Sequence, residues 1–258
     1  MKTFDSGLMN VYSQWRVKLE DFNESEKYFF TDELMSNVSS ILDVGCGCGG
    51  LGNALKIRFG TAFSYTGINT KETCVIKGEK ISPELKIIDG IFPNSIKSGK
   101  MFDMICAFGF FHMVLEWKKL LFNLTKFANK FVNVGVVSRL EGATVIDPDV
   151  SYYYYLDSGD RVPSIAINIR ELLNYCCHHE LRVKRIKYYG YHNKSFRSTA
   201  FRPIQEKDTI YGNLFLELFE PGNETVPFGG LAPNQTNRRQ FVPDLEIIID
   251  GKSWNEWR

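Results

Sequence analysis

The stretch Ile41-Leu42-Asp43-Val44-Gly45-Cys46-Gly47-Cys48-Gly49-Gly50 decides the fold of this chain. A short apolar run ends in an aspartate and is stopped by closely spaced glycines, and a helical period resumes over 51–59. The pattern predicts a strand, a tight turn and a helix. Such a turn lets the backbone approach a ligand closely and points unpaired helix N–H groups at it. The glycines satisfy both G-x-G-x-G and G-x-G-x-x-G, so they do not by themselves distinguish one nucleotide-containing cofactor from another.

Strand-like and helix-like segments alternate after this turn. The strand-like segments are apolar and short, and the helix-like ones carry apolar residues at helical spacing; the expected strands are 62–68, 85–88, 101–108 and 131–137, and the expected helices are 71–80 and 117–130. Strands that alternate with helices of about 10 to 15 residues indicate βαβ units around a mostly parallel sheet. The sequence therefore predicts a doubly wound, Rossmann-like α/β fold.

The segments outside this alternation predict additions to a single domain. Two helices are expected within 11–35, around the polar break Asn23-Glu24-Ser25, and an insertion over the sheet edge is expected where prolines and four tyrosines interrupt the alternation. A last helix at 169–179 precedes two strands, 181–189 and 211–219, that can pair antiparallel at the edge, and 245–249 is a short strand candidate. The expected parts are a helical cap (1–37), a core (38–138), an insertion (139–168), a last helix with edge strands (169–219) and a C-terminal extension (220–258).

Composition narrows the function classes. The 31 basic and 30 acidic residues nearly cancel, so no overall positive field exists to hold a nucleic acid, although a local basic patch is compatible with this total. The most apolar stretch, 104–115, is about a dozen residues, whereas a membrane-spanning helix needs roughly 20. The first ten residues lack the apolar core of a signal peptide. We expect a soluble protein that does not act at a membrane.

The cysteines predict free thiols rather than disulfides or a metal site. Several of the six cysteines have apolar or glycine-rich neighbours, where thiols behave as small hydrophobic groups, which suits a cytoplasmic protein. Cys176-Cys177-His178-His179 contains zinc-ligand residue types, but on a helix only Cys176 and His179 share a face. We therefore expect no metal.

The glycine turn and the aspartate before it carry a family resemblance. The run from Ile41 to Gly50 resembles the first motif of class I S-adenosylmethionine (SAM)-dependent methyltransferases, written L-D-x-G-x-G-x-G, and the resemblance covers roughly 38–137. It implies SAM as the cofactor and S-adenosylhomocysteine (SAH) as its product. It places Asp43 near the amino-acid end of the cofactor and passes the turn under the ribose and methionine portions, with contacts at Gly45, Cys46, Gly47 and Gly49.

The ends of the next three expected strands extend this resemblance. In the family the second strand ends in an acid that accepts both ribose hydroxyls, but this chain has Asn69, an amide without charge assistance. Either the cofactor affinity is modest, or Glu72 or a neighbour compensates. A site for a nicotinamide cofactor also requires an acid at this position, so Asn69 disfavours that interpretation too. The resemblance implies an adenine contact at Asp89, Gly90 and Ile91, and a contact with the methionine part at Ala107 and Phe108. An Asp-Gly pair also forms turns for purely conformational reasons.

Candidate catalytic and substrate residues lie outside the glycine motif. His112 parallels a histidine that follows the fourth strand in small-molecule methyltransferases, and a histidine titrating near about 6.5 suits a general base for a hydroxyl acceptor. Two other roles are possible for His112: it caps the helix that starts near Glu116, or it forms a hydrogen bond with the backbone. Substrate contacts are expected from the N-terminal helices and from the tyrosine run, of which at most two residues face one pocket; the candidates are Tyr12, Trp15, Arg16, Tyr152 and Tyr154.

Two motifs that the chain lacks narrow the choice of methyl acceptor. The fourth strand ends in Ala107-Phe108-Gly109-Phe110 rather than Asp/Asn-Pro-Pro-Tyr, which disfavours DNA amino methylation, and the chain contains no Pro-Cys pair, which disfavours covalent cytosine-C5 methylation. The favoured acceptor is a hydroxyl or amine of a metabolite, natural product or surface-glycan precursor. The alternatives are an RNA or protein methyltransferase, and a non-catalytic or nicotinamide-binding Rossmann protein.

Overall fold

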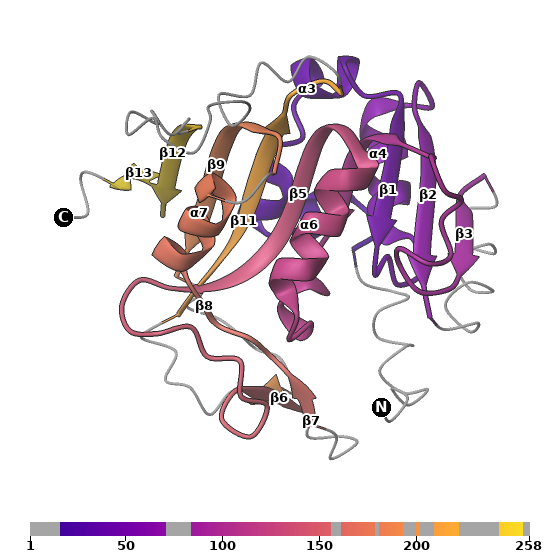
Figure 1. Ribbon diagram of the computed structural model, residues 1–258. Coiled ribbons are helices and arrows are strands. Elements are labelled where there is room, and N and C mark those ends of the chain that lie inside the picture. The colour runs from indigo at the N-terminus through magenta and orange to yellow at the C-terminus, as the bar shows by residue number, and fades with distance from the viewer. Residues whose placement is uncertain are drawn as a thin grey trace, which may run out of the picture.

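The computed structural model describes residues 16–70, 84–155, 161–178, 181–192, 200–201, 209–221 and 243–254 (Figure 1). Most strands of these residues join one mixed sheet; they are β1 (Ser40–Val44), β2 (Ser64–Asn69), β3 (Lys86–Asp89), β4 (Phe102–Ala107), β5 (Ala128–Arg139), β8 (Ile167–Asn168), β9 (Val183–Tyr191), β11 (Thr209–Leu218), β12 (Asp244–Ile249) and β13 (Lys252–Ser253). The sheet order is β13-β12-β9-β11-β5-β4-β1-β2-β3, and β8 pairs with β5 beside this path.

The half of the sheet that carries the glycine motif is parallel throughout. β3, β2, β1, β4 and β5 all pair in parallel, and the chain order reverses between β1 and β4. In doubly wound sheets ligands bind outside the carboxyl ends of the strands at this reversal. The glycine turn follows β1 and therefore lies at the reversal. The predicted doubly wound, mostly parallel architecture is confirmed.

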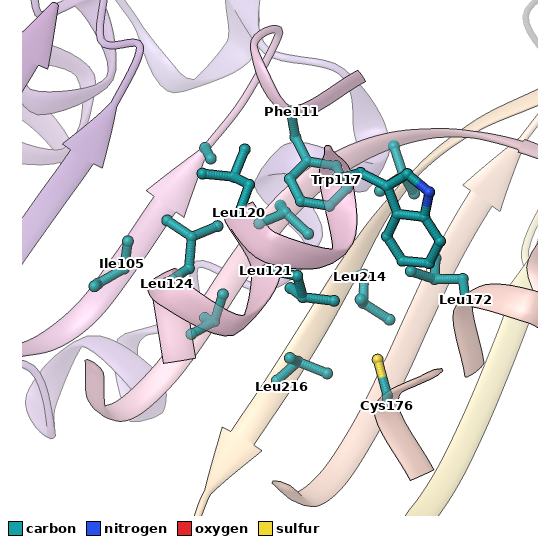
Figure 2. Close-up of a cluster of buried hydrophobic side chains, with 14 of the residues drawn as sticks. Ile105, Phe111, Trp117, Leu120, Leu121, Leu124, Leu172, Cys176, Leu214 and Leu216 are labelled. Atoms are coloured by element: carbon teal, nitrogen blue, oxygen red, sulfur yellow. The ribbon is translucent and has the colours of Figure 1, made fainter. Parts of the chain in front are cut away.

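Two helices cover one face of the sheet with an apolar layer. α6 (Trp117–Phe127) and α7 (Ile169–His178) meet through Trp117 and Tyr175, whose ring centroids are 5.3 Å apart. Figure 2 shows leucines of α6 against Ile105, Leu214 and Leu216 of the strands. Cys176 is buried in the same layer, where it acts as a small apolar side chain. In the part of the chain that is described, none of the helices has the length and apolar character needed to cross a membrane.

The opposite face is covered by α4 (Gly50–Phe59) and by the short N-terminal helices α2 (Glu24–Tyr28) and α3 (Asp32–Ser36). Their apolar residues form a second buried layer with the strands, and its helix and loop members include Phe22, Phe29, Phe30, Met35, Val38, Leu51, Ala54 and Leu55. The helices on the two faces complete a three-layer α/β arrangement around the central sheet.

The predicted break in the N-terminal helices is wrong. Asn23-Glu24-Ser25 starts a helix instead of separating two, because the backbone N–H of Asn23 donates to the Glu26 carboxylate at 2.9 Å and closes the first turn of α2. Within the described residues 16–22 before it, the structure has the 3-10 turn η1 (Leu19–Asp21) and no α-helix. Residues 1–15 lie outside the described residues, as does the predicted helix at 71–80.

The end of one predicted helix and the place of two predicted strands in the sheet are corrected. The helix expected over 117–130 ends at Phe127, because Ala128 already pairs with Phe102 of β4. The strands expected at the sheet edge, now β9 and β11, are internal, since β12 pairs in parallel with β9 and β13 follows it. The short strand predicted at 245–249 is confirmed as β12, and it is this C-terminal segment that forms the edge.

The predicted insertion is only partly separate from the main sheet. β6 (Tyr152–Tyr155) and β7 (Arg161–Pro163) form a small sheet with β10 (Ala200–Phe201), but the last two residues of the insertion are β8, which pairs with β5. The small sheet lies below the main sheet in Figure 1, on the side to which the arrows of β2 and β3 point. The insertion therefore stands at the carboxyl ends of the parallel strands.

Gly52 allows α4 to pack closely on β2. A Cβ atom at this position would lie 2.8 Å from three ring atoms of Tyr65. We expect Gly52→Ala to lower the free energy of unfolding by about 1–3 kcal/mol, because overpacking outweighs the gain of roughly 1 kcal/mol in helix propensity. Ile57→Ala, at an exposed position of the same helix, is the control and should not destabilise. Urea denaturation of both variants checks this, and an unchanged Gly52→Ala midpoint would contradict it.

Candidate functional site

The glycine turn after β1 has a backbone that only glycines adopt easily. Gly45, Gly47 and Gly49 have φ values of +75°, +55° and +80°. The N–H groups of Gly45 and Cys46 donate to the carbonyl of Ile68 at 2.9 and 3.3 Å, which ties the turn to the end of β2. α4 begins at Gly50, so its first N–H groups, which have no partner within the helix, face the end of the turn.

The two sides of the turn differ in packing. A Cβ at Gly45 would lie 2.5 Å from Cβ and 2.6 Å from Cγ of Phe110, so this side is closed by an aromatic ring. Among the residues that the structure describes, a Cβ at Gly47 would meet no atom within 4 Å. The backbone at Gly47 is therefore bare and open, which is the arrangement that a close-lying ligand requires.

Parallel register brings the other predicted cofactor residues to the level of this turn. Val44 pairs with Ile68, so Gly45 stands beside Asn69, and Asn69 in turn pairs with Asp89. Asn69 is half-buried, Asp89 is exposed, and the N–H of Gly90 donates to the Asn69 carbonyl at 2.9 Å. Ile91 is 61% exposed just beyond them. The amide and the carboxylate that sequence reasoning selected thus lie on neighbouring strand ends.

The end of β4 lies on the other side of the turn. Ala107 is fully buried in the layer beneath α6, so it has only its backbone to offer a ligand. Phe108 faces the opposite layer, where its ring contacts that of Phe30 at 6.1 Å between centroids. Gly109 follows with a φ of +63° and turns the chain away from the sheet.

Asp43 is enclosed by the protein rather than open to solvent. It is 3% exposed, and the Tyr65 hydroxyl donates to its Oδ2 at 2.6 Å. Burial raises the pKa of Asp43 from 3.8 to about 7; the Tyr65 hydrogen bond acts against this rise, and the charge of Glu26 adds to it. A carboxyl group with this pKa changes charge near neutral pH.

Two thiols share the surroundings of Asp43. Burial raises the pKa values of Cys46 and Cys106 well above the ordinary range, and the nearby Asp43 carboxylate raises them further. Both cysteines therefore stay protonated at neutral pH, and their sulfur atoms act as packing groups rather than nucleophiles. Cys46 lies against Gly67, where a Cβ would be 2.6 Å from its Sγ.

His112 lies in the 3-10 turn η2 (Phe111–Met113) that follows β4, and it is 4% exposed. Its ring centroid is 6.4 Å from that of Tyr211, and its backbone carbonyl accepts a hydrogen bond from the N–H of Ile165 at 2.7 Å. The alternative of a helix cap is wrong, because the cap position of α6 is Glu116. The geometry puts His112 at the junction between the β4 end and the insertion.

The predicted substrate residues are only partly described. Tyr12 and Trp15 lie outside the described residues, and so does the side chain of Tyr154. Tyr152 belongs to the small sheet, where the Arg161 guanidinium lies 4.4 Å from its ring centroid. Arg16 forms an ion pair with Glu26 at 3.0 Å. Of these candidates, the structure brings Arg16 to the sheet face that carries Asp43.

Sequence reasoning missed a buried polar network on that face. Tyr211 donates to Glu26 at 2.9 Å, Ser25 donates to Asn213 at 2.9 Å, and Asn213 donates to Asn133 at 2.9 Å. Glu26, Ser25, Asn133 and Asn213 are each 0% exposed. Glu26 and Tyr211 are 185 positions apart. No local pattern signals this contact, because Glu26 looks like an ordinary surface residue of a polar helix.

Comparison with known proteins supports the fold. No protein-family model matches the chain, and no curated protein matches it in sequence. Among solved structures, a SAM-dependent methyltransferase from Clostridium acetobutylicum has a TM-score of 0.53 at 12% identity, over 83% of this chain and 98% of that chain. The N-terminal domain of EvdMO1 with SAH bound has a TM-score of 0.51 at 11% identity, over 84% and 98%.

A third solved structure matches over a shorter length. The O-methyltransferase from a trans-AT polyketide synthase multienzyme of Brevibacillus brevis, in complex with SAH, has a TM-score of 0.45 at 15% identity. The match covers 60% of this chain and 50% of that chain, so the chain spans about half of that protein's length. At these identities the comparisons establish a shared fold.

Proposed function

We propose that this protein, which has the Rossmann-like fold of the class I methyltransferases, transfers a methyl group from SAM to a hydroxyl or amine of a small molecule. The observation that carries the proposal is the open glycine turn at the sheet reversal, with Asn69 and Asp89 at the same level. The SAH bound in the EvdMO1 domain, which shares the fold, supports the choice of cofactor.

The residues present fit SAM in chemistry. The bare backbone at Gly47 and the start of α4 offer N–H groups and space, Asn69 offers an amide for a ribose hydroxyl, and the exposed Asp89 carboxylate suits an adenine amino group. Asp43, buried behind the turn, is the proposed carboxylate for the cationic amino-acid end, and it is mostly charged above about pH 7. SAM supplies an already activated methyl group, so the task of the chain is to align the acceptor and exclude water.

The acceptor side of the proposal rests on charge and position. The near balance of 31 basic and 30 acidic residues favours a small molecule over a polyanion. His112, at the end of β4, is the proposed base for a hydroxyl acceptor, and the small sheet with Tyr152 and Arg161 is the proposed cover. The five cysteines of the described residues are free thiols, which supports the cytoplasm as the location.

Gly47→Ala tests the cofactor site with a matched control. The new methyl group would fill the open space above the turn, so we expect SAH affinity to fall about tenfold or more, equivalent to about 1.4 kcal/mol. Gly60→Ala is the control, because Gly60 also has a positive φ (+76°) with no atom within 4 Å of its Cβ position but lies at the far end of α4. Calorimetric titration of SAH into all three proteins measures the effect.

The outcomes separate the site from general strain. Gly60 has a φ of +76° and a ψ of −156°, a backbone conformation that is essentially restricted to glycine. Gly60→Ala should therefore lower the unfolding temperature, yet it should leave SAH affinity unchanged. Equal SAH affinity of Gly47→Ala and wild type would place the cofactor elsewhere, and no SAH binding by wild type would end the methyltransferase proposal.

A further inference from the structure

Tyr211 reaches from β11 across β5 to the end of β4. Asn213 pairs with Gly135, and Tyr211 lies two residues before Asn213 on the same face of the strand. A Cβ at Gly135 would lie 2.7 Å from the Tyr211 hydroxyl and 3.5 Å from both the Gly109 nitrogen and the Phe108 Cα. The hydroxyl and the Phe108-Gly109 backbone therefore border the same space, which is the one that the missing side chain of Gly135 leaves.

The hydroxyl is held there by a buried carboxylate. Glu26 Oε1 accepts from Tyr211 at 2.9 Å and from Arg16 Nη1 at 3.0 Å, and Oε2 accepts from the N–H of Asn23 at 2.9 Å. Burial raises the pKa of Tyr211 well above its ordinary range, and the negative charge of Glu26 raises it further. Tyr211 is thus a permanent donor, and a hydrogen bond to a buried charged acceptor holds its hydroxyl firmly in one place.

The carboxylate itself is fixed to the sheet through α2. Ser25, beside Glu26, donates to Asn213 at 2.9 Å, and the ring of Tyr28 stacks on that of Tyr189 with centroids 4.4 Å apart. α2 therefore cannot shift without breaking contacts with β9 and β11. Glu26 and Tyr211 connect this rigid N-terminal segment to the loop end of β4.

The Phe108-Gly109 turn needs such support because its other side is open. Gly109 has a φ of +63°, it is exposed, and a Cβ there would meet no atom of the described part of the chain within 4 Å. The turn follows β4, one of the two strands that flank the reversal of the sheet, where a ligand is expected. Its position relative to the glycine turn therefore affects the space left for that ligand.

We propose that Tyr211 and Glu26 are positioning residues for the cofactor: the Glu26-held hydroxyl of Tyr211 supports the Phe108-Gly109 turn in the place that receives SAM. This role rests on the proposed function. It assigns the polar network on the α2 face to the binding of the methyl donor rather than to folding alone.

SAH titration of two variants and their combination tests this role. Tyr211→Phe removes the hydroxyl, and Gly135→Ala places a methyl group 2.7 Å from the hydroxyl, too close for the hydroxyl to keep its position. Each variant should bind SAH about tenfold more weakly. The double variant should also bind about tenfold more weakly than wild type, not a hundredfold, because both changes remove the same support. Titrations are made well below the unfolding temperature of every variant.

Tyr188→Phe is the matched control. Tyr188 is a buried tyrosine of the neighbouring strand β9, but it belongs to the α6 and α7 layer on the opposite face. Tyr188→Phe also removes a buried tyrosine hydroxyl, but it should leave SAH binding unchanged, so only Tyr211→Phe should weaken it. Wild-type affinity in Tyr211→Phe, or a hundredfold loss in the double variant, overturns this role. Failure of wild type to bind SAH overturns the proposed function and this role together.

Discussion

Replacing Asp43 by asparagine is expected to stabilise the fold above pH 7 while it weakens cofactor binding. The pKa of Asp43 is about 7 in the folded protein against an ordinary 3.8, chiefly because of burial. Between these pH values the folded state binds more protons than the unfolded chain, so stability falls as pH rises from about 4 to 7 and stays low above. The difference in pKa corresponds to about 4 kcal/mol.

Asparagine has no charge to bury, so Asp43→Asn removes the destabilisation caused by the buried carboxylate and keeps a side chain of the same shape. Its amide oxygen can accept the Tyr65 hydrogen bond that Asp43 accepts at 2.6 Å. We expect the free energy of unfolding to rise by about 2–4 kcal/mol at pH 8, to change little at pH 4, and to lose most of the dependence on pH that Asp43 contributes. Urea denaturation at a series of pH values measures this, and SAH titration of the same variant should show a weakened site.

Asp103 is the control, because the fold lowers the pKa of its carboxyl group whereas it raises the pKa of Asp43. Burial tends to raise its pKa, but hydrogen bonds from the Ser39 side chain and backbone, together with Lys130, hold the pKa below its ordinary value. Its stabilising effect is therefore present above its unfolded pKa and lost as pH falls through the folded pKa. Asp103→Asn should lower stability at pH 8. If Asp43→Asn also lowered stability at pH 8, the buried carboxyl would not be a cost to the fold.

Gly45→Ala should destabilise the protein strongly, by about 2–5 kcal/mol, through two separate effects. The new Cβ would lie 2.5 Å from Cβ of Phe110, and the φ of +75° disfavours any residue with a side chain. Because Phe110 packs on the turn through its own Cβ and Cγ, rotation of its ring cannot relieve the contact. Urea denaturation at neutral pH measures the loss.

Two further variants separate the contact from the backbone strain. Gly99→Ala carries the strain alone, since Gly99 has a φ of +77° and no atom within 4 Å of its Cβ position, and it should cost about 1–2 kcal/mol. Phe110→Gly combined with Gly45→Ala should cost less than the sum of the single changes, because glycine at position 110 lacks both the Cβ and the Cγ that the new Cβ would meet. Strictly additive losses would show that Phe110 does not press on the turn in solution.

Local patterns were sufficient for the parallel half of the fold. An apolar run, the glycines after it and the helical period that follows are all contiguous, so β1, its turn and α4 could be read directly. The positions of Asn69 and Asp89 followed from the rule that the carboxyl ends of parallel strands meet at one edge, and the register of β2 and β3 puts them side by side. Their roles with SAM stay predictions.

The sequence did not predict the helix ends and strand positions that depend on contacts beyond the segment itself. The start of α2 depends on how Glu26 closes back on Asn23, and the end of α6 depends on the pairing of Ala128 with Phe102. The internal position of β9 depends on β12, a strand more than fifty residues later. Helical or strand periodicity carries no information about such partners, because it describes one segment at a time.

By itself, the sequence determined the architecture and the glycine turn, since apolar periodicity and glycine conformation are properties of neighbouring residues. Only the tertiary structure decided the state of the groups around that turn. Asp43 has a pKa near 7 because the folded protein buries it, although the Tyr65 hydrogen bond acts against the rise. The Tyr211 hydroxyl lies beside Gly135, which has no side chain, and Glu26 holds it there. Burial and hydrogen bonding between distant segments exist only once the chain has folded.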